Sequence, residues 1–190
     1  MDINRKYRTI TREQFLFHEM RIVARLLDGG MDEEKVKEEV VANNLFQYPT
    51  ERMIKNIASV CLNRFKETDS KELIHIVATE SSDVAKQACL FLMMNYYRLV
   101  WEFMITVIGE KYRTKDSSFT RLQEQNDVVA SWSNATINKC KQVLKKTLVE
   151  TGYLNNNRSE VLNPVLLDYS VREAIENTNN SEALVAFGCM

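Results

Sequence analysis

Polar and basic side chains recur on one side of the segment Asn134–Thr151, which has the apolar periodicity of a helix. At about 100° per residue, that side carries the amides and ammonium groups of Asn138, Lys139, Gln142, Lys145 and Lys146. Ammonium groups bind phosphate oxygens, and amides pair with the edges of bases in the major groove. These residue types at this spacing therefore predict a helix that contacts nucleic acid.

The opposite side of the same segment is apolar and would anchor the helix in a core. It consists of Ile137, Cys140, Val143, Leu144 and Leu148. Ser133 precedes the helix as the expected N-cap, because its hydroxyl can accept a free backbone N–H, and Gly152 follows as the expected end. A recognition helix needs this division between a buried and a polar face.

The segments around this helix favour a winged helix-turn-helix. A helix is expected over Thr120–Ala130 and a turn at Ser131–Ser133, whereas Tyr153–Leu154 and Val161–Leu167 read as two short strands around a polar turn. Arg158 would lie at the tip of this wing and reach an adjacent phosphate. Two other interpretations stay open. The lysines could belong to an ordinary solvated surface helix, and a winged domain could bind proteins.

The N-terminus carries a second basic candidate site, formed by Arg5, Lys6 and Arg8 with Tyr7 between them. A short basic arm of this kind can lie along a phosphate backbone while its aromatic ring stacks on a base. Short basic termini are also common and often inert, so both interpretations stand.

Charge is segregated along the chain although the formal net charge is only −1. Met1–Leu27 and Asn134–Arg158 are predominantly basic, whereas Asp28–Thr50 and Ser159–Met190 are predominantly acidic. A polyanion would therefore be bound by a local surface and not by the net charge of the molecule.

Signals for catalysis and for metal binding are weak. The two histidines, His18 and His75, lie in apolar helical segments, and the sequence has no glycine-rich phosphate loop, nucleophile elbow or HExxH motif. The four cysteines are too widely spaced for a zinc site and indicate reduced thiols. The sequence predicts a non-catalytic protein without a metal or cofactor.

The most apolar segment is Val84–Gly109, which is interrupted by Lys86, Arg98 and Glu102. Each of these charges would be costly at the centre of a bilayer. We therefore expect a buried helix, no membrane contact and a cytoplasmic protein, since the N-terminus also lacks the apolar core of a secretory signal.

The first part of the chain predicts a bundle of five helices. They begin at Thr11, Asp32, Thr50, Ser70 and the cap signal Ser81–Asp83, and the last runs as one long central helix to about Tyr112. In the third helix, Met53, Ile57, Val60 and Cys61 share the apolar face, whereas Arg52, Lys55 and Arg64 point elsewhere. The predicted fold class is mainly all-α: a helical bundle over residues 1–116, then a winged helix-turn-helix-like unit over 117–190 with at most a short β-hairpin.

Several stretches of the chain resemble the BrxA family of bacteriophage exclusion (BREX) systems. They are Arg21–Leu27, Asn44–Gln47, Tyr96–Leu99 with Glu110–Tyr112, Trp132–Ser133 with Thr136 and Gln142–Leu144, and Gly152–Leu154. The resemblance runs from about Phe15 to Leu167, and its motifs are typical of the fold and not of catalysis.

The resemblance implies a small helical phage-defence protein that is encoded with a methyltransferase, an ATPase and other components. The family has been likened to NusB, a helical RNA-binding factor, and its members are thought to bind DNA. It has also been labelled an inner-membrane protein, against which the charges in Val84–Gly109 argue. The expected partner is double-stranded DNA, bound largely without sequence preference. The alternatives are RNA binding, or an assembly adaptor whose acidic faces, around Glu33–Glu39 and in the C-terminal tail, dock other defence components.

Overall fold

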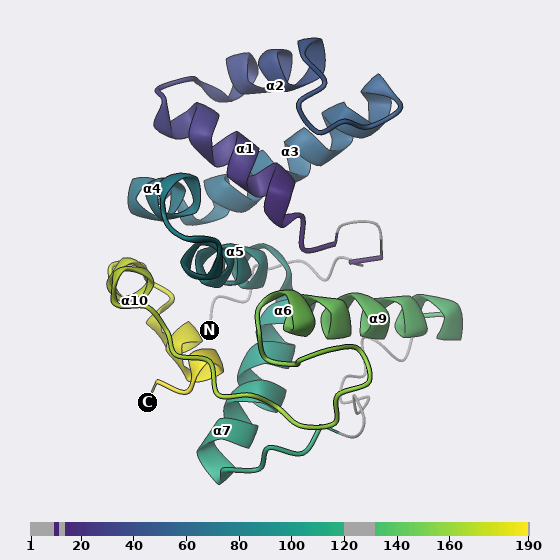
Figure 1. Cartoon of the computed structure of the whole chain (residues 1–190), viewed down its shortest axis with the longest axis vertical. Helices are drawn as coiled ribbons and strands as arrows, with labels where there is room; N and C mark the ends of the chain where they lie inside the picture. The colour runs from purple at the N-terminus through teal and green to yellow at the C-terminus, as the bar shows by residue number, and fades with distance from the viewer. Residues whose placement is uncertain (1–9, 12–13, 120–131, 190) are drawn as a thin grey trace.

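The computed structural model describes residues 10–11, 14–119 and 132–189, and the described part of the chain is mainly α-helical (Figure 1). Its first helices are α1 (Phe17–Asp28), α2 (Glu33–Ala42), α3 (Glu51–Thr68), α4 (Lys71–Thr79) and α5 (Ser82–Tyr96). They are followed by α6 (Arg98–Glu102), the π-helix η1 (Phe103–Gly109), α7 (Glu110–Thr114), α9 (Asn134–Glu150), α10 (Tyr169–Glu176) and the 3₁₀-helix η2 (Ser181–Phe187). The predicted all-α class is confirmed, whereas the predicted helix over Thr120–Ala130 lies outside the described residues.

Side-chain caps set the start of most of the helices in the first half. The side chains of Asp32, Thr50, Ser70 and Ser81 each accept a hydrogen bond from a backbone N–H three residues later. These are the starts that the sequence predicts. The start of α1 is different, because that helix begins at Phe17 and not at Thr11, after Leu16 in the left-handed conformation.

The core forms around α5, in which residues on all sides are buried, including Ala85, Leu90, Phe91 and Met94. Helices α3 and α4 pack directly on α5, and α1 lies against α3 and α4. Helix α2 completes this end of the molecule by packing on α1 and α3 (Figure 1).

The predicted long central helix is broken at Tyr97. The backbone of Tyr97 is extended (φ −114°, ψ 109°), and the chain turns there from α5 into the rod formed by α6, η1 and α7 (Figure 1). Just before the break, the amide of the buried Asn95 donates to the carbonyl of Phe91 at 3.0 Å. The ring of Tyr97 is fully buried and lies 5.3 Å from the guanidinium of Arg64. The helix thus breaks at a residue that contacts Arg64 of α3. The apolar pattern of the sequence did not indicate this break.

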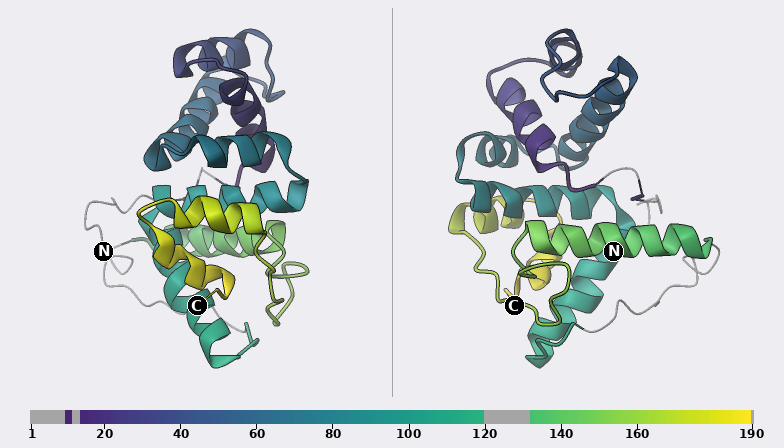
Figure 2. Two further views of the ribbon diagram at one scale, coloured as in Figure 1. Left: turned by 90° about the vertical axis from the view of Figure 1, so that its left-hand side faces the viewer. Right: turned by 45° about the vertical axis from the view of Figure 1, so that its right-hand side comes forward.

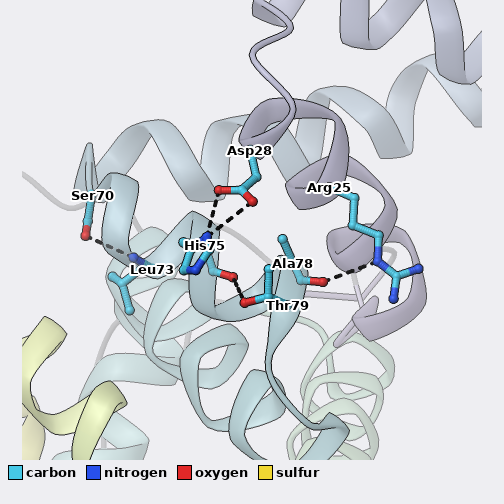
Figure 3. A network of polar contacts seen from close by, with 7 residues as sticks. All are labelled: Arg25, Asp28, Ser70, Leu73, His75, Ala78 and Thr79. Atoms are coloured by element: carbon cyan, nitrogen blue, oxygen red, sulfur yellow. Dashed lines mark hydrogen bonds and ion pairs between the residues drawn. The ribbon is translucent and has the colours of Figure 1, made fainter.

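Arginines of α1 cap the C-terminal end of α4, and Figure 3 shows the contact that Arg25 makes there. Arg25 Nε donates to the carbonyl of Ala78 at 3.3 Å, and Arg21 donates to the carbonyl of Glu80 at 2.6 Å. Cations near the last carbonyls of a helix are favourable, because those groups have no partner within the helix. On the same side, His75 contacts the carboxylate of Asp28 at 3.1 Å. Two of the basic residues in the N-terminal segment thus hold the fold together.

The last helices return to the first part of the chain. Helix α10 packs on α4 and α5, and η2 packs on η1 (Figure 2). Buried apolar residues from Ile10 to Phe187 form one continuous cluster. The predicted division of the chain at residue 116 stays a prediction.

The predicted hairpin of the wing is not confirmed, since the described residues contain no named strand. The hydroxyl of the fully buried Tyr153 donates to the carbonyl of Ala186, and Leu154 N–H donates to the carbonyl of Leu148 at the end of α9. Val161 instead forms an isolated antiparallel bridge with Ser118. Residues 153–154 therefore cap α9 and fill the core.

Within the described ranges, no helix is long and apolar enough to cross a membrane. Val84–Gly109, the most apolar segment, is divided among α5, α6 and η1.

Candidate nucleic-acid interface

Helix α9 has the two faces that its sequence predicts. Ile137, Cys140, Val143, Leu144 and Leu148 are all buried, with exposed fractions between 1% and 9%. The hydroxyl of Ser133 accepts from the backbone N–H of Thr136 at 3.2 Å, and Gly152 follows the helix with a positive φ of 83°. The N-terminal end of α9 projects away from α6 (Figures 1 and 2). On its polar face, Asn138, Lys139, Gln142 and Lys146 are exposed.

Four of the predicted site residues converge on one groove, which we call the lysine groove. Its volume is about 430 Å³, and it is lined by Gln14, Lys139, Gln142, Val143, Lys145, Lys146 and Asn157. Lys139, Gln142 and Lys146 are exposed, and Lys145 is half-buried. Three ammonium groups and three amides therefore face one volume, which suits an anion that also accepts and donates hydrogen bonds.

Two other predicted site residues that the structure describes, Asn138 and Arg158, are not among those that line this groove. Asn138 and Arg158 are both exposed, and Arg158 directly follows Asn157, which does line it. The backbone N–H of Arg158 donates to the side chain of Asn156 at 2.8 Å, within a tight turn after α9. Arg5, Lys6 and Arg8 lie outside the described residues.

Gln14 is a site residue that the sequence analysis missed. Lys146 Nζ donates to Gln14 Oε1 at 2.7 Å, which joins the chain before α1 to the polar face of α9. The two residues are 132 positions apart, so no local pattern relates them. Asn157 was missed although it is close in sequence, because only the course of the turn after α9 brings it to the groove.

The segment that carries Gln14 is fixed in place by Arg64 of α3. Arg64 donates to the carbonyls of Gln14 at 2.7 Å and Phe15 at 2.8 Å, and its side chain has no exposed surface. The outward orientation predicted for Arg64 is therefore wrong. The buried face of α3 instead contains Ile54, and Met53 is 44% exposed. The apolar pattern of the sequence predicted that Met53 is buried and Arg64 is not. It could not indicate that the guanidinium of Arg64 would find two backbone carbonyls and an aromatic ring in the core.

Leu16, between this segment and α1, has a strained backbone. Its φ of 58° and ψ of 38° place it in the left-handed region, which costs a residue with a side chain roughly 1–2 kcal/mol. Such strain persists where the surroundings determine the conformation, and it is concentrated at functional sites. Here the bonds from Arg64 to the two preceding carbonyls hold the chain immediately before Leu16.

A second hollow, which we call the α1–α9 cleft, adjoins the lysine groove. Its volume is about 550 Å³, and it is lined by Gln14, Phe15, Leu16, Phe17, His18, Glu19, Tyr48, Met53, Ile57, Lys146 and Glu150. Gln14 and Lys146 line both hollows. Lys146 therefore stands at the boundary between a basic groove and a cleft of mixed character.

The Tyr48 hydroxyl donates to Glu19 Oε1 at 2.5 Å inside the cleft. Burial raises the pKa of Tyr48 above its ordinary value, and the hydrogen bond to Glu19 raises it further. Tyr48 is therefore a neutral donor at physiological pH. Among the described residues, no cluster of His, Cys, Asp and Glu side chains has an arrangement that could hold a metal ion.

Comparison with known proteins relates the chain to one family throughout most of its length. The family model described as BrxA matches residues 5–179. A BREX protein BrxA from Bacillus cereus is 36% identical over 169 residues, which cover 83% of this chain and 84% of that protein. A BREX protein BrxA from Escherichia coli is 28% identical over 159 residues, covering 78% of this chain and 74% of that one.

A solved structure has a similar fold. The crystal structure of an uncharacterized protein from Magnetospirillum magneticum superposes with a TM-score of 0.74 at 21% identity, covering 95% of this chain and 97% of that one. The family match and the identity to the Bacillus cereus protein, which both extend well beyond half of the sequence, show that this chain belongs to the BrxA family.

Proposed function

We propose that this protein is a non-catalytic, cytoplasmic component of a BREX phage-defence system and that it binds double-stranded DNA through the outer face of α9. The family supports the assignment to a BREX system, since its relatives in Bacillus cereus and Escherichia coli are BREX proteins. The observation that carries the second part is the lysine groove, in which Lys139, Lys145 and Lys146 converge with Gln142 on one volume.

The chemistry of the groove favours the phosphate backbone as its main contact. Lysine ammonium groups bind phosphate oxygens of any sequence and release condensed counterions when they do so. Gln142 and Asn138, on the same helix, offer amides that can pair with base edges. Binding would therefore be largely electrostatic, with little sequence selectivity.

The first prediction concerns the salt dependence of binding to a labelled random DNA duplex. With about four phosphate contacts, the logarithm of the association constant should fall with the logarithm of the salt concentration with a slope of roughly −4. A Lys139→Glu, Lys145→Glu, Lys146→Glu variant should lose this binding. Fluorescence anisotropy across a salt series measures both quantities.

The matched control is a Lys35→Glu, Lys55→Glu, Lys66→Glu variant, which has the same net charge. Its three lysines are exposed on α2 and α3 and line neither hollow. If this variant still binds DNA with the same salt dependence, the position of the lysines, and not the net charge of the protein, determines the affinity. A slope near zero for the parent protein would contradict the proposal, and stronger binding to an RNA duplex would favour the NusB-like alternative.

A specific observation also supports the adaptor alternative. Leu166 and Tyr169 are 89% and 75% exposed, although both are large apolar side chains. The side chain of Gln87 holds this segment, since it donates to the carbonyl of Leu166 at 2.9 Å and accepts from the N–H of Asp168 at 2.8 Å. An ordered segment that presents apolar side chains to solvent, beside the exposed acids Glu173 and Glu176 of α10, suits a protein partner with basic and apolar residues.

A further inference from the structure

We propose that the α1–α9 cleft receives one unpaired nucleobase from DNA whose phosphates lie in the adjoining lysine groove. This inference rests on the proposed DNA binding and goes beyond it, because it assigns a preference for DNA with an unstacked base. The cleft and the groove share Gln14 and Lys146, so a nucleotide whose phosphate contacts Lys146 would have its base at the mouth of the cleft.

The volume and the walls of the cleft suit a flat, partly polar ring. Its volume of about 550 Å³ lies within the usual range of small-ligand sites, about 300–1,000 Å³. One part of the lining is apolar and aromatic, with Phe17, Tyr48, Met53 and Ile57. Unstacked bases are bound by stacking on aromatic and apolar side chains, and this interaction tolerates any base sequence.

The charged residues that line the two hollows differ, and this difference determines which hollow would hold the base and which the phosphate. The cleft contains the carboxylates of Glu19 and Glu150, which would repel a phosphate but accept hydrogen bonds from the N–H groups of a base. Among the described residues, none of those that line the lysine groove is acidic. A nucleotide therefore fits the pair of hollows in one direction, with the phosphate in the groove and the neutral base in the cleft.

Contacts within the protein hold the walls of the cleft in place. The buried Arg64 holds the carbonyls of Gln14 and Phe15 at one wall, and Leu16 keeps its left-handed backbone there. At another wall, the hydroxyl of Tyr48 is bonded to Glu19. A site whose walls are already fixed loses little conformational freedom when it binds a ligand.

The test compares binding of the full chain to a paired duplex with binding to the same duplex carrying one unpaired guanine. An unpaired base is already free of its partner, so the protein avoids the cost of extracting it. The parent protein should bind the bulged duplex about 10-fold more tightly, which is within the contribution of one stacked base. A Met53→Ala, Ile57→Ala variant removes part of the apolar wall without changing charge. It should lose this preference and keep the parent affinity for the paired duplex.

A Met31→Ala, Leu166→Ala variant serves as the control, because it truncates exposed apolar side chains outside the cleft. As an independent measurement, a bulged 5-iodouracil should crosslink on irradiation to a peptide containing Phe17 or Tyr48. Equal affinity of the parent for the two duplexes, a preference that survives in the cleft variant, or crosslinks confined to Lys139, Gln142 and Lys145, which line only the groove, would each overturn the inference while the proposed function stands. Absence of binding to both duplexes would overturn the proposed function as well.

Discussion

Arg64 links the core of the protein to the candidate site through a single side chain. A guanidinium without exposed surface is costly to bury unless its donors find partners. Arg64 donates to two backbone carbonyls, those of Gln14 and Phe15, and lies 5.3 Å from the ring of Tyr97. Arg64 therefore positions Gln14 at the lysine groove and also contacts Tyr97, the residue at which α5 ends and α6 begins.

Replacing Arg64 by methionine should destabilise the protein by roughly 2–6 kcal/mol, because two carbonyls lose their donor and each such loss costs about 1–3 kcal/mol. Urea unfolding followed by circular dichroism measures this change in the free energy of unfolding. Arg64→Lys should recover only part of it, since one ammonium does not reproduce the planar fork of a guanidinium. A loss below about 1 kcal/mol for Arg64→Met would contradict this account of Arg64.

At the scale of elements, the close packing of η1 against η2 depends on Gly109. A Cβ atom at this position would lie 2.6 Å from Val185 Cγ1 and 3.1 Å from the carbonyl oxygen of Val185. The two elements could not keep their present separation with any larger residue at this position. Because Ala186 and Phe187 of η2 are buried, this contact fixes the C-terminal end of the chain in the core.

Gly109→Ala should therefore destabilise the protein by about 1–3 kcal/mol, the usual cost of overpacking, although alanine favours helix more than glycine does. Removing the clashing methyl groups with Val185→Ala in the same chain should offset part of the loss. A double-mutant cycle of unfolding free energies would show this as a favourable coupling. Additive effects of the two substitutions would mean that the clash is relieved elsewhere.

The elements that sequence analysis predicted are those governed by local chemistry. The caps at Asp32, Thr50, Ser70 and Ser81 act within one turn of their helices, so their residue types were sufficient to predict them. The break at Tyr97 and the 3₁₀-helix η2 were not predicted, because they involve contacts between distant segments. The candidate site divides in the same way: the faces of α9 follow from periodicity, whereas Gln14 and Asn157 join the groove only through the tertiary fold.

At the scale of the whole molecule, the packing of α10 and η2 on the first part of the chain predicts cooperative unfolding. The apolar cluster is continuous from Ile10 to Phe187, and α10 contacts both α4 and α5. A chain with one continuous core usually unfolds in one transition, whereas two independent domains can unfold separately.

The two tryptophans, one on each side of residue 116, allow this to be measured. Trp101 is 5% exposed on α6, and Trp132 lies half-buried before α9. The Trp101→Phe and Trp132→Phe variants each keep one tryptophan. In each variant, we expect the urea midpoint of the tryptophan fluorescence to equal the urea midpoint of the circular dichroism. Two separated midpoints would instead support the division of the chain at residue 116.

The bond between Lys146 and Gln14 also has a consequence for the order in which the protein is synthesised. Gln14 leaves the ribosome early, whereas Lys146 follows 132 residues later. The lysine groove therefore cannot assemble on a nascent chain until α9 has emerged and folded back on the first residues. Premature termination before α9 would release fragments without this surface, and such fragments would not compete with the finished protein for DNA.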